Sequence, residues 1–410
     1  MQRTQKTKMF LLVKIAERVK NLEYAIRDVQ TRARKIQQQR RVHWLNIGDP
    51  GLFDFQTPKY IIKALAKAAY DGKNYYADSL GVAELRELII KAERSKIRAD
   101  LPMDNIVITT GVSEGIMFTA AALAEPGLEM LLPGPCYGPY ISYCNFFGGK
   151  GVEYELSEEK GWDPDVEDLR SKISDKTNAI MVSSPNNPTG KMYKEKTMQR
   201  IVDIAGEYDI PIISDEIYDK IVYDGDFTHP ATLSKDVPVI GMNGFSKAHM
   251  STGWRLGYLY FYDPENKIPE VKENIEKLAR TRLCANTPAQ YAAMEAFKRP
   301  RNYTDMMVKK LKKRRDYSYK RLQEIEEISV VKPDGAFYMF PKIKLNGLWK
   351  DDKDFVIDIL ENTGICFVYG SGFGEYGRGH FRTTFLPPID DLEEVYDKLQ
   401  RYIKEKTEKH

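Results

Sequence analysis

The sequence has very little cysteine. Only four of its 410 residues are cysteines, Cys136, Cys144, Cys284 and Cys366, and no two of them form a Cys-x-x-Cys pair. Such scattered cysteines indicate neither a zinc site nor a disulfide framework. We therefore expect reduced thiols, as in a cytoplasmic protein, and no metal site.

The sequence also has little excess charge of either sign. Its 62 Lys and Arg residues nearly balance its 59 Asp and Glu residues, which leaves a formal net charge of +3. For a chain of this size, that charge is too small to indicate nucleic acid or an acidic membrane surface as the main partner. We expect no nucleic-acid partner.

No long hydrophobic run occurs near the start of the sequence. The longest run there is residues 9–13, MFLLV, and lysines flank it on both sides. A membrane span needs about 20 apolar residues, and a signal peptide has a longer core followed by a small-residue cleavage site. We therefore expect a cytoplasmic protein with no membrane partner.

What the sequence does contain is typical of a large globular protein. Hydrophobic residues make up 42% and charged residues 30% of the chain, and the length favours two or three domains. Residues 1–45 are polar and basic, and their pattern predicts one or two amphipathic helices with a solvated face. A loop rich in glycine, proline and aromatic residues, NIGDPGLFDFQTP, begins at Asn46.

Short apolar runs then alternate with helical patterns. Strands are predicted at residues 106–110, 130–133, 179–184, 210–214, 237–242 and 256–261, and helices at residues 113–124, 194–207, 267–282 and 303–327. Nearly continuous apolar strands separated by helices are typical of a mainly parallel sheet that is buried on both faces. The predicted fold class is therefore α/β, with a final alternation of strand and helix after Gly335.

Polar residues follow the predicted strands at the points where ligands bind in open α/β sheets. The segments that follow them are GVSEG (111–115), PNNPTG (185–190), DEIY (215–218) and NGFSK (243–247), with GWRLG (253–257) shortly after. Together they offer a glycine turn into a helix, an amide, a carboxylate, a phenol, an amine and a guanidinium. This set could hold an anion and supply an amine nucleophile.

Nine longer strings resemble those of one enzyme family, the class I/II aminotransferases, and in particular the archaeal alanine aminotransferases. The strings are NIGDPGLFDFQTP, NYYADSLGVAELRE, PGPCYGPY, SSPNNPTG, ISDEIYD, NGFSKAHMSTGWRLGY, RLCANTPAQ, DGAFYMFPKI and GSGFGEYGRGHFRTTFLPP. The resemblance runs from about residue 24 to the C-terminal helix and does not cover residues 1–23.

The resemblance implies a fold type I transferase that uses pyridoxal 5′-phosphate (PLP). It implies a mostly parallel central sheet flanked by helices, in a large PLP-binding domain of residues 58–300. A smaller α+β domain would combine the N-terminal segment, residues 1–57, with residues 301–410. It also implies a homodimer that transfers an amino group between an L-amino acid and a 2-oxo acid, namely alanine with 2-oxoglutarate.

The resemblance also implies a role for each of several residues. Lys247 would form a Schiff base with the cofactor aldehyde and, once freed, carry a proton. Asp215 would pair with the pyridine nitrogen and keep it protonated, so that the ring can accept electrons. Asn187 and Tyr218 would donate to the phenolic oxygen O3′, and the ring of Tyr137 would stack on the pyridine.

Two groups of residues would hold the anions. The phosphate would bind Val112 and Ser113 at a helix N-terminus, together with Ser246 and Arg255. Tyr76 would reach the phosphate of the neighbouring subunit, although the adjacent Tyr75 is an alternative. Gly48, Asn187 and Arg382 would bind the substrate, with Arg382 gripping the α-carboxylate through its planar guanidinium.

Three alternatives remain open from the sequence. An aspartate aminotransferase would need a second cation for the substrate side chain, and Arg280 and Arg282 are candidates. A β-lyase or an aminocyclopropane-type synthase would use the same residues to hold the cofactor. A regulator that joins a PLP domain to a DNA-binding module is a third alternative, although residues 1–45 are short for a winged helix.

Overall fold

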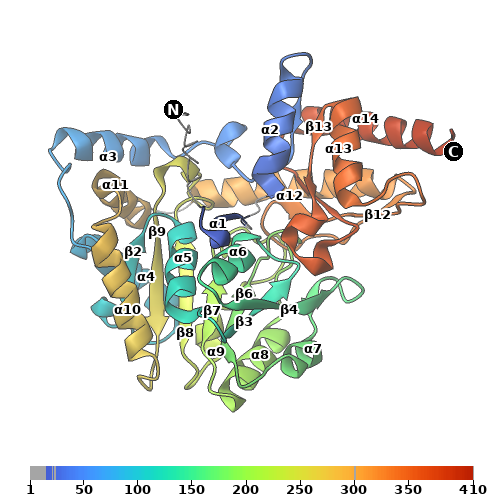
Figure 1. Cartoon of the computed structure of the whole chain (residues 1–410). Coiled ribbons are helices and arrows are strands. Elements are labelled where there is room, and N and C mark those ends of the chain that lie inside the picture. The colour runs from blue at the N-terminus through green and yellow to red at the C-terminus, as the bar shows by residue number, and fades with distance from the viewer. Residues whose placement is uncertain (1–14, 21, 23–24, 300–301, 410) are drawn as a thin grey trace, which may run out of the picture.

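A sheet of eight strands forms the centre of the chain in a computed structural model, which describes residues 15–20, 22, 25–299 and 302–409 (Figure 1). In spatial order, its strands are β2 (Ile106–Thr109), β9 (Gly257–Tyr262), β8 (Val239–Gly244), β7 (Ile212–Asp215), β6 (Thr177–Ser183), β3 (Glu129–Gly134), β4 (Lys150–Ser157) and β5 (Asp163–Pro164). The five strands from β8 to β4 run parallel, whereas β9, β2 and β5 pair antiparallel with their neighbours. The predicted α/β class is confirmed.

The apolar runs of the sequence become the central strands because both faces of the sheet are covered. Every residue of β2, β7 and β8 is buried, which explains why these strands lack an alternating pattern. All six predicted strands are present, within two residues at each end. Strand β4 was not predicted because Lys150, Glu153 and Glu155 interrupt its apolar residues near the edge of the sheet.

Helices surround this sheet, and two of them, α5 and α6, pack on the same face of it (Figure 1). The helices of this part are α3 (Lys59–Tyr70), α4 (Ala83–Ile97), α5 (Val112–Leu123), α6 (Pro139–Phe146), α7 (Val166–Ser171), α8 (Glu195–Glu207), α9 (Pro230–Leu233), α10 (Pro269–Arg282) and α11 (Thr287–Lys298). The predicted helices at 113–124, 194–207 and 267–282 correspond to α5, α8 and α10, within two residues at each end.

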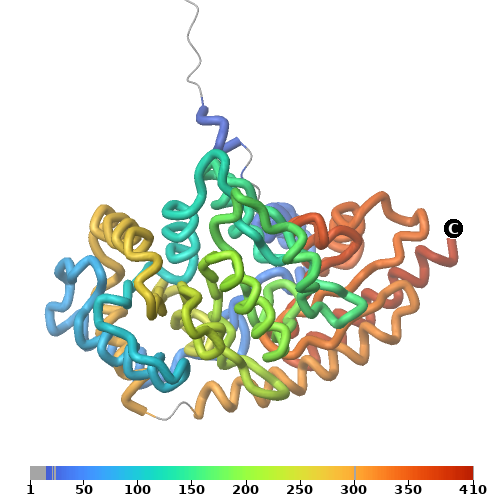
Figure 2. The backbone as a smooth tube through the Cα atoms, turned by 90° about the horizontal axis from the view of Figure 1, so that it is seen from below, coloured from blue at the N-terminus to red at the C-terminus, as the bar shows by residue number. Residues whose placement is uncertain are grey.

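The C-terminal elements form a second group beside the large sheet. They are α12 (Asn302–Gln323), β10 (Ile328–Ser329), β11 (Tyr338–Met339), β12 (Lys342–Ile343), α13 (Asp352–Thr363), β13 (Ile365–Cys366), β14 (Val368–Tyr369), β15 (Phe381–Thr384) and α14 (Ile389–Thr407). Helix α12 runs along one side of the molecule toward the other C-terminal elements (Figure 2). It ends four residues before the predicted helix 303–327 does.

The N-terminal segment joins this C-terminal group. Strand β1 (His43–Trp44) pairs in parallel with β13, and α2 (Ala25–Gln37) contacts α13, β13 and β14. Helix α2 buries Ala25, Ile26, Val29 and Ala33, and a short helix, α1 (Glu17–Lys20), precedes it. The part of the N-terminal prediction that falls on residues 1–14 lies outside the described residues. The proposed domain boundaries stay a prediction.

None of the described helices combines the length and apolar composition that crossing a bilayer requires. At the middle of the sheet, the ends of neighbouring parallel strands lie side by side, with Ser183 of β6 opposite Asp215 of β7 and Asp215 opposite Met242 of β8. The loops that follow these strands therefore start from the same edge of the sheet.

Candidate active site

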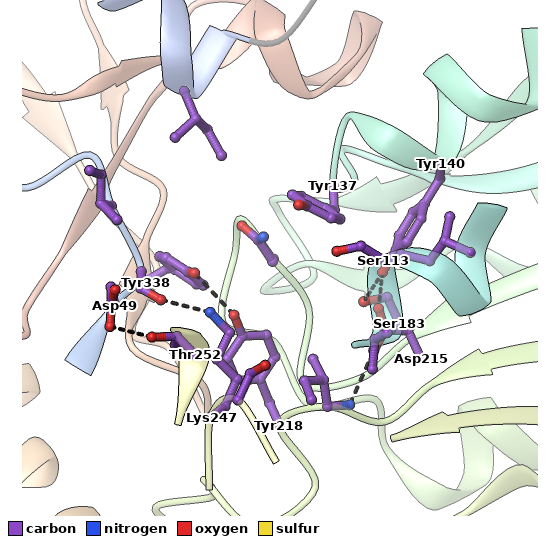
Figure 3. Close-up of a pocket in the computed structure, with 18 of the residues that line it drawn as sticks. Asp49, Ser113, Tyr137, Tyr140, Ser183, Asp215, Tyr218, Lys247, Thr252 and Tyr338 are labelled. Carbon is purple, nitrogen blue, oxygen red and sulfur yellow. Dashed lines mark hydrogen bonds between the residues drawn. The ribbon is translucent and has the colours of Figure 1, made fainter. Parts of the chain in front are cut away.

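A cavity of about 520 Å³ lies at this edge (Figure 3). It is bordered by the ends of the parallel strands, the start of α5, the loop after β1 and the C-terminal elements. Among the predicted site residues, those that line it are Gly48, Val112, Ser113, Tyr137, Asn187, Asp215, Tyr218, Ser246, Lys247, Arg255 and Arg382. Tyr76, the remaining residue with an assigned role, does not line the cavity of this chain.

Lys247 places an amine in the middle of the cavity. Its Nζ donates a hydrogen bond to the carbonyl of Gly48 at 2.6 Å (Figure 3). Removal from water lowers the pKa of Lys247 to about 8, and the nearby guanidinium groups of Arg382 and Arg255 act in the same direction, whereas Asp49 opposes it. A substantial fraction of this amine is therefore neutral, and nucleophilic, near physiological pH.

Asp215 ends strand β7 with its carboxylate in the cavity wall. The Oδ2 atom accepts a hydrogen bond from the hydroxyl of Tyr140 at 2.6 Å, and Oδ1 accepts one from the backbone N–H of Ile217 at 3.1 Å. Burial raises the pKa of Asp215 to about 6, although these two bonds act in the opposite direction. A positively charged ligand group beside it would hold the carboxyl ionised.

Arg382 brings a buried cation to another part of the same cavity. Its side chain comes from β15 and is 1% exposed. Its Nη1 donates to Oδ1 of Asn187 at 2.9 Å, and its Nη2 donates to the carbonyl of Asn46. The Nε atom is buried without a hydrogen-bond partner, and within the described residues the guanidinium donates to two neutral oxygens rather than to a carboxylate. Such a cation is suited to binding a carboxylate ligand.

Aromatic residues fill the space between Lys247 and Arg382. The hydroxyls of Tyr218 and Tyr338 lie 3.0 Å apart (Figure 3), and the guanidinium of Arg382 lies 4.4 Å from the centre of the Tyr338 ring. Tyr137 lines the cavity from the loop before α6, with its ring edge-to-face against Tyr140 at 5.7 Å. These rings place apolar surface beside the polar groups, and a lower local dielectric strengthens electrostatic interactions.

Donor groups gather at the start of α5. Nη1 of Arg255 lies 3.5 Å from Oγ of Ser246, and Nη2 lies 3.4 Å from Oγ of Ser113. The backbone must come very close here, because a Cβ on Gly111 would lie 2.4 Å from Arg255 Nη2 and one on Gly257 would lie 2.8 Å from the Val112 nitrogen. Two hydroxyls, a guanidinium and a helix N-terminus form a site for an anion.

Comparisons with known proteins agree with this geometry. Residues 40–399 match the family described as "Aminotransferase class I and II". The chain belongs to this family of aminotransferases. The solved structure of an alanine aminotransferase from Pyrococcus furiosus has 53% sequence identity and a TM-score of 0.94, with 96% of this chain and 100% of that chain covered.

Two curated relatives carry different substrate names. The glutamate-pyruvate aminotransferase AlaA of Haemophilus influenzae is 34% identical over 395 residues, which cover 95% of this chain and 97% of that protein. The probable aspartate aminotransferase of Methanocaldococcus jannaschii is 37% identical over 352 residues, which cover 86% and 90%. The chain is thus an aminotransferase with the fold type I architecture of its structural neighbours.

Aminotransferases of this family use PLP, and the residues of the cavity fit that cofactor. The anion site at α5 fits the phosphate, the amine of Lys247 fits the aldehyde, and the carboxylate of Asp215 fits a protonated ring nitrogen. The buried, unpartnered Nε of Arg382 fits the carboxylate that every amino acid and 2-oxo acid substrate carries.

Several residues of this aminotransferase cavity were missed in the sequence. Tyr140 lies three residues after Tyr137 in the same string, which puts both rings near one another at the start of α6. Asp49 accepts a hydrogen bond from the hydroxyl of Thr252 at 2.8 Å, and Arg27 lines the cavity from α2. No spacing in the sequence links Asp49 to Thr252 or Arg27 to this edge of the sheet.

The two arginines considered for a second substrate carboxylate do not line the cavity. Arg282 pairs with Glu114 at 3.1 Å and donates to the carbonyl of Ile108 at 3.0 Å, so it fastens α10 to the start of α5. Arg280 pairs with Glu276 on the exposed side of α10. Arg27 is the arginine that lines the cavity on the N-terminal side.

Proposed function

We propose that this aminotransferase transfers the amino group of alanine to 2-oxoglutarate, with PLP bound at Lys247. The observation that carries the proposal is one cavity that contains a low-pKa amine, a buried carboxylate and a buried guanidinium without a carboxylate partner among the described residues. The name of the Pyrococcus relative supports alanine as a substrate, and the name of the Haemophilus relative supports the pairing of glutamate with pyruvate, the 2-oxo acid that corresponds to alanine. The cytoplasm is the proposed location.

When bound, PLP supplies an aldehyde carbon that takes up an amino group and a ring that accepts an electron pair. Once the substrate has displaced it from the cofactor, the amine of Lys247 would act as general base and acid, taking a proton from the substrate Cα and delivering one to the former aldehyde carbon. The lowered pKa of its amine suits this work, because a base with a pKa near the operating pH is efficient.

The other cavity residues stabilise the charges of the cofactor and fix its orientation during this transfer. Asp215 holds the proton on the ring nitrogen, and Tyr140 keeps the Asp215 carboxylate in place through its short hydrogen bond. Asn187 and Tyr218 donate to the O3′ oxygen, and Tyr137 covers one face of the ring. Ser113, Ser246, Arg255 and the backbone at Val112 bind the phosphate.

Arg382 and Gly48 bind the α-carboxylate of the substrate, which orients the Cα–H bond for removal of its proton. Glutamate and 2-oxoglutarate carry a second carboxylate that alanine and pyruvate lack. We assign the binding of this second carboxylate to Arg27, which lines the cavity from α2. Within the described residues, its Nη1 donates to the neutral side chain of Gln30 and not to a carboxylate. A guanidinium can bind a carboxylate through two parallel hydrogen bonds.

The active unit in this proposal is a homodimer in which Tyr76 reaches the phosphate bound by the partner chain. The Tyr76 side chain is 78% exposed in the single chain, which fits burial against a second copy. Tyr75 is the poorer choice, because its hydroxyl is already bonded to the hydroxyl of Tyr291 at 2.8 Å. We also propose that residues 58–300 and the remaining residues are two domains that close over the substrate.

A panel of half-reactions tests the substrate proposal. Purified protein loaded with PLP is mixed with alanine, glutamate, aspartate or an aromatic amino acid, and the loss of the visible absorbance of the bound cofactor is followed. We expect alanine and glutamate to react fastest, and Arg27→Met to slow glutamate while leaving alanine little changed. A much faster reaction with aspartate would instead support the activity named for the Methanocaldococcus relative.

A further inference from the structure

A second group of charged side chains is buried behind the turn that carries Asp215 and Tyr218. The turn covers residues 215–219, and its side chains divide between two sides. Asp215 and Tyr218 line the cavity, whereas Glu216 and Asp219 are buried but do not line it. Two carboxylates removed from water destabilise a fold unless cations and hydrogen-bond donors face them.

Lys96 of helix α4 supplies the cation at Asp219. Its Nζ lies 3.0 Å from Asp219 Oδ2 and 2.8 Å from Oε1 of Glu93, and the hydroxyl of Tyr258 donates to the same Glu93 oxygen at 2.6 Å. Burial opposes the charge on both partners. Even so, Lys96 lowers the pKa of Asp219 to about 2, and Asp219 and Glu93 raise that of Lys96 well above its ordinary value.

His229, directly before α9, supplies the donor at Glu216. Its Nδ1 lies 2.9 Å from Glu216 Oε2, while the hydroxyls of Tyr260 and Ser214 donate to Oε1 at 2.8 and 3.0 Å. Glu216 raises the pKa of His229 although burial opposes it. The turn is therefore fixed at two points on the side away from the cavity. Lys96 of α4 contacts Asp219 at one end of the turn, and His229 contacts Glu216 near the other end.

Ligand atoms of Glu93, Glu216 and His229 also lie within 4.8 Å of one another, as in a metal site. Lys96 already contacts Glu93, however, and His229 already contacts Glu216. The places that an ion would take beside these carboxylates are thus occupied by Nζ of Lys96 and Nδ1 of His229. The exposed Lys220 adds a weaker contact, 3.9 Å from Asp219.

We propose that Lys96 and His229 are positioning residues that hold Asp215 and Tyr218 in place by fixing Asp219 and Glu216 behind the turn. The inference rests on the proposed roles of Asp215 and Tyr218 toward PLP. Helix α4 and the segment before α9 would then matter for the reaction although neither of these two side chains lines the cavity. A backbone turn held at two points resists the small displacements that weaken catalysis.

The double variant Lys96→Met, Glu93→Gln tests this role without changing the net charge of the buried group. Glutamine can still accept the hydrogen bond of Tyr258, but Asp219 loses its ammonium partner. Two quantities are measured: the dissociation constant of PLP, from an absorbance titration of the cofactor-free protein, and the separate kcat and KM values of the half-reaction with alanine. We expect roughly tenfold weaker PLP binding and a roughly tenfold lower kcat, with KM within about threefold.

Asp358→Asn is the matched control, since it breaks the ion pair with Lys406 between α13 and α14. We expect it to lower the melting temperature but to change neither PLP binding nor kcat. Asp219→Asn provides a second test if the double variant does not fold, because Lys96 keeps its pair with Glu93, and it should lower kcat in the same way.

The inference is overturned if these variants fold and keep wild-type PLP affinity and kcat while Asp215→Asn is impaired. If Asp215→Asn itself binds PLP and turns over normally, the proposed function of the turn fails instead.

Discussion

At the scale of single residues, the amine of Lys247 has the property that is simplest to measure. Burial lowers its pKa to about 8 in the cofactor-free chain, and only the neutral amine attacks an aldehyde. The rate at which the cofactor-free protein acquires its visible band with PLP should therefore rise with pH and level off just above pH 8. Stopped-flow absorbance checks this, and a rate still rising at pH 10 would contradict the assigned environment of Lys247.

The hydrogen bond from Tyr140 to Asp215 leads to a second prediction at this scale. Burial raises the pKa of Asp215 and this bond lowers it, so Tyr140→Phe should raise it further. A hydrogen bond to a charged group contributes about 1.5–3 kcal/mol, and one pKa unit corresponds to about 1.4 kcal/mol. The carboxyl must be ionised to hold the ring proton. As the pH falls, Tyr140→Phe should therefore lose activity at a pH about one to two units higher than the wild type does.

Tyr154→Phe is the control for this variant. Its hydroxyl is also buried but donates to the backbone carbonyl of Met181 at 2.8 Å rather than to a carboxylate. The pH–activity profile of kcat/KM should be unchanged in Tyr154→Phe even if the protein is less stable. Superimposable profiles for Tyr140→Phe and the wild type would mean that Tyr140 does not affect the ionisation of Asp215.

At the scale of single residues, the sequence predicted those site residues whose role follows from a known motif. Lys247, Asp215 and Arg382 belong to recognisable strings and line one cavity. Tyr140, Asp49 and Tyr338 also lie in such strings, but they were missed because each is hydrogen-bonded to a residue far along the chain, and a motif does not encode that partner. Tyr76 differs from these residues, because the phosphate proposed for it is bound by a second chain.

At the scale of elements, the close approach of β9 to the start of α5 carries a prediction. A Cβ on Gly257 would lie 2.8 Å from backbone atoms of Gly111 and Val112, and backbone cannot move aside as a side chain can. Gly257→Ala should therefore displace the first turn of α5 and weaken PLP binding by about tenfold or more, because the phosphate donors lose their arrangement. Absorbance titration with PLP measures this.

Gly206→Ala in α8 is the control for that variant, since its added Cβ would meet only the tip of Val237 at 3.1 Å, far along the chain from the phosphate site. It should leave the dissociation constant of PLP unchanged. Equal PLP affinities for the two variants would show that the approach of β9 does not shape the anion site.

The positions of the strands could be predicted from the sequence where every residue of the strand is buried. Strands β2, β7 and β8 are buried along their whole length because helices cover both faces of the sheet, so each begins with apolar residues and carries polar ones only at or near its end. Strand β4 lies near the edge, where charged side chains reach water, so its pattern is mixed and was not recognised. The pairing of β1 with β13 could not be predicted, because two-residue strands carry no periodicity.

At the scale of the whole molecule, the proposed homodimer predicts that two defective chains can restore each other. Lys247→Ala lacks the amine but retains Tyr76, and Tyr76→Ala has the reverse defect. In a mixed dimer, one site would combine an intact Lys247 with an intact Tyr76. At a PLP concentration that leaves Tyr76→Ala mostly unloaded, co-refolded chains should regain up to about a quarter of wild-type activity.

The control mixes Lys247→Ala with Asp215→Ala. Both residues serve the site of their own chain, so no mixed dimer contains a complete site and no activity should return. If sedimentation shows that dimers form but neither mixture regains activity, Tyr76 does not contribute to the site across the interface.

The pairing of β1 with β13 also has a consequence for how the chain is made. His43 and Ile365 lie 322 residues apart, so the ribosome needs roughly 16 to 64 s to synthesise the second strand after the first, at about 5–20 residues per second. During that interval the eight-stranded sheet can assemble, while residues 25–45 still lack the C-terminal elements on which they pack, α13, β13 and β14. Nascent chains stalled before residue 365 should be cut by protease in this segment, and released full-length chains should resist.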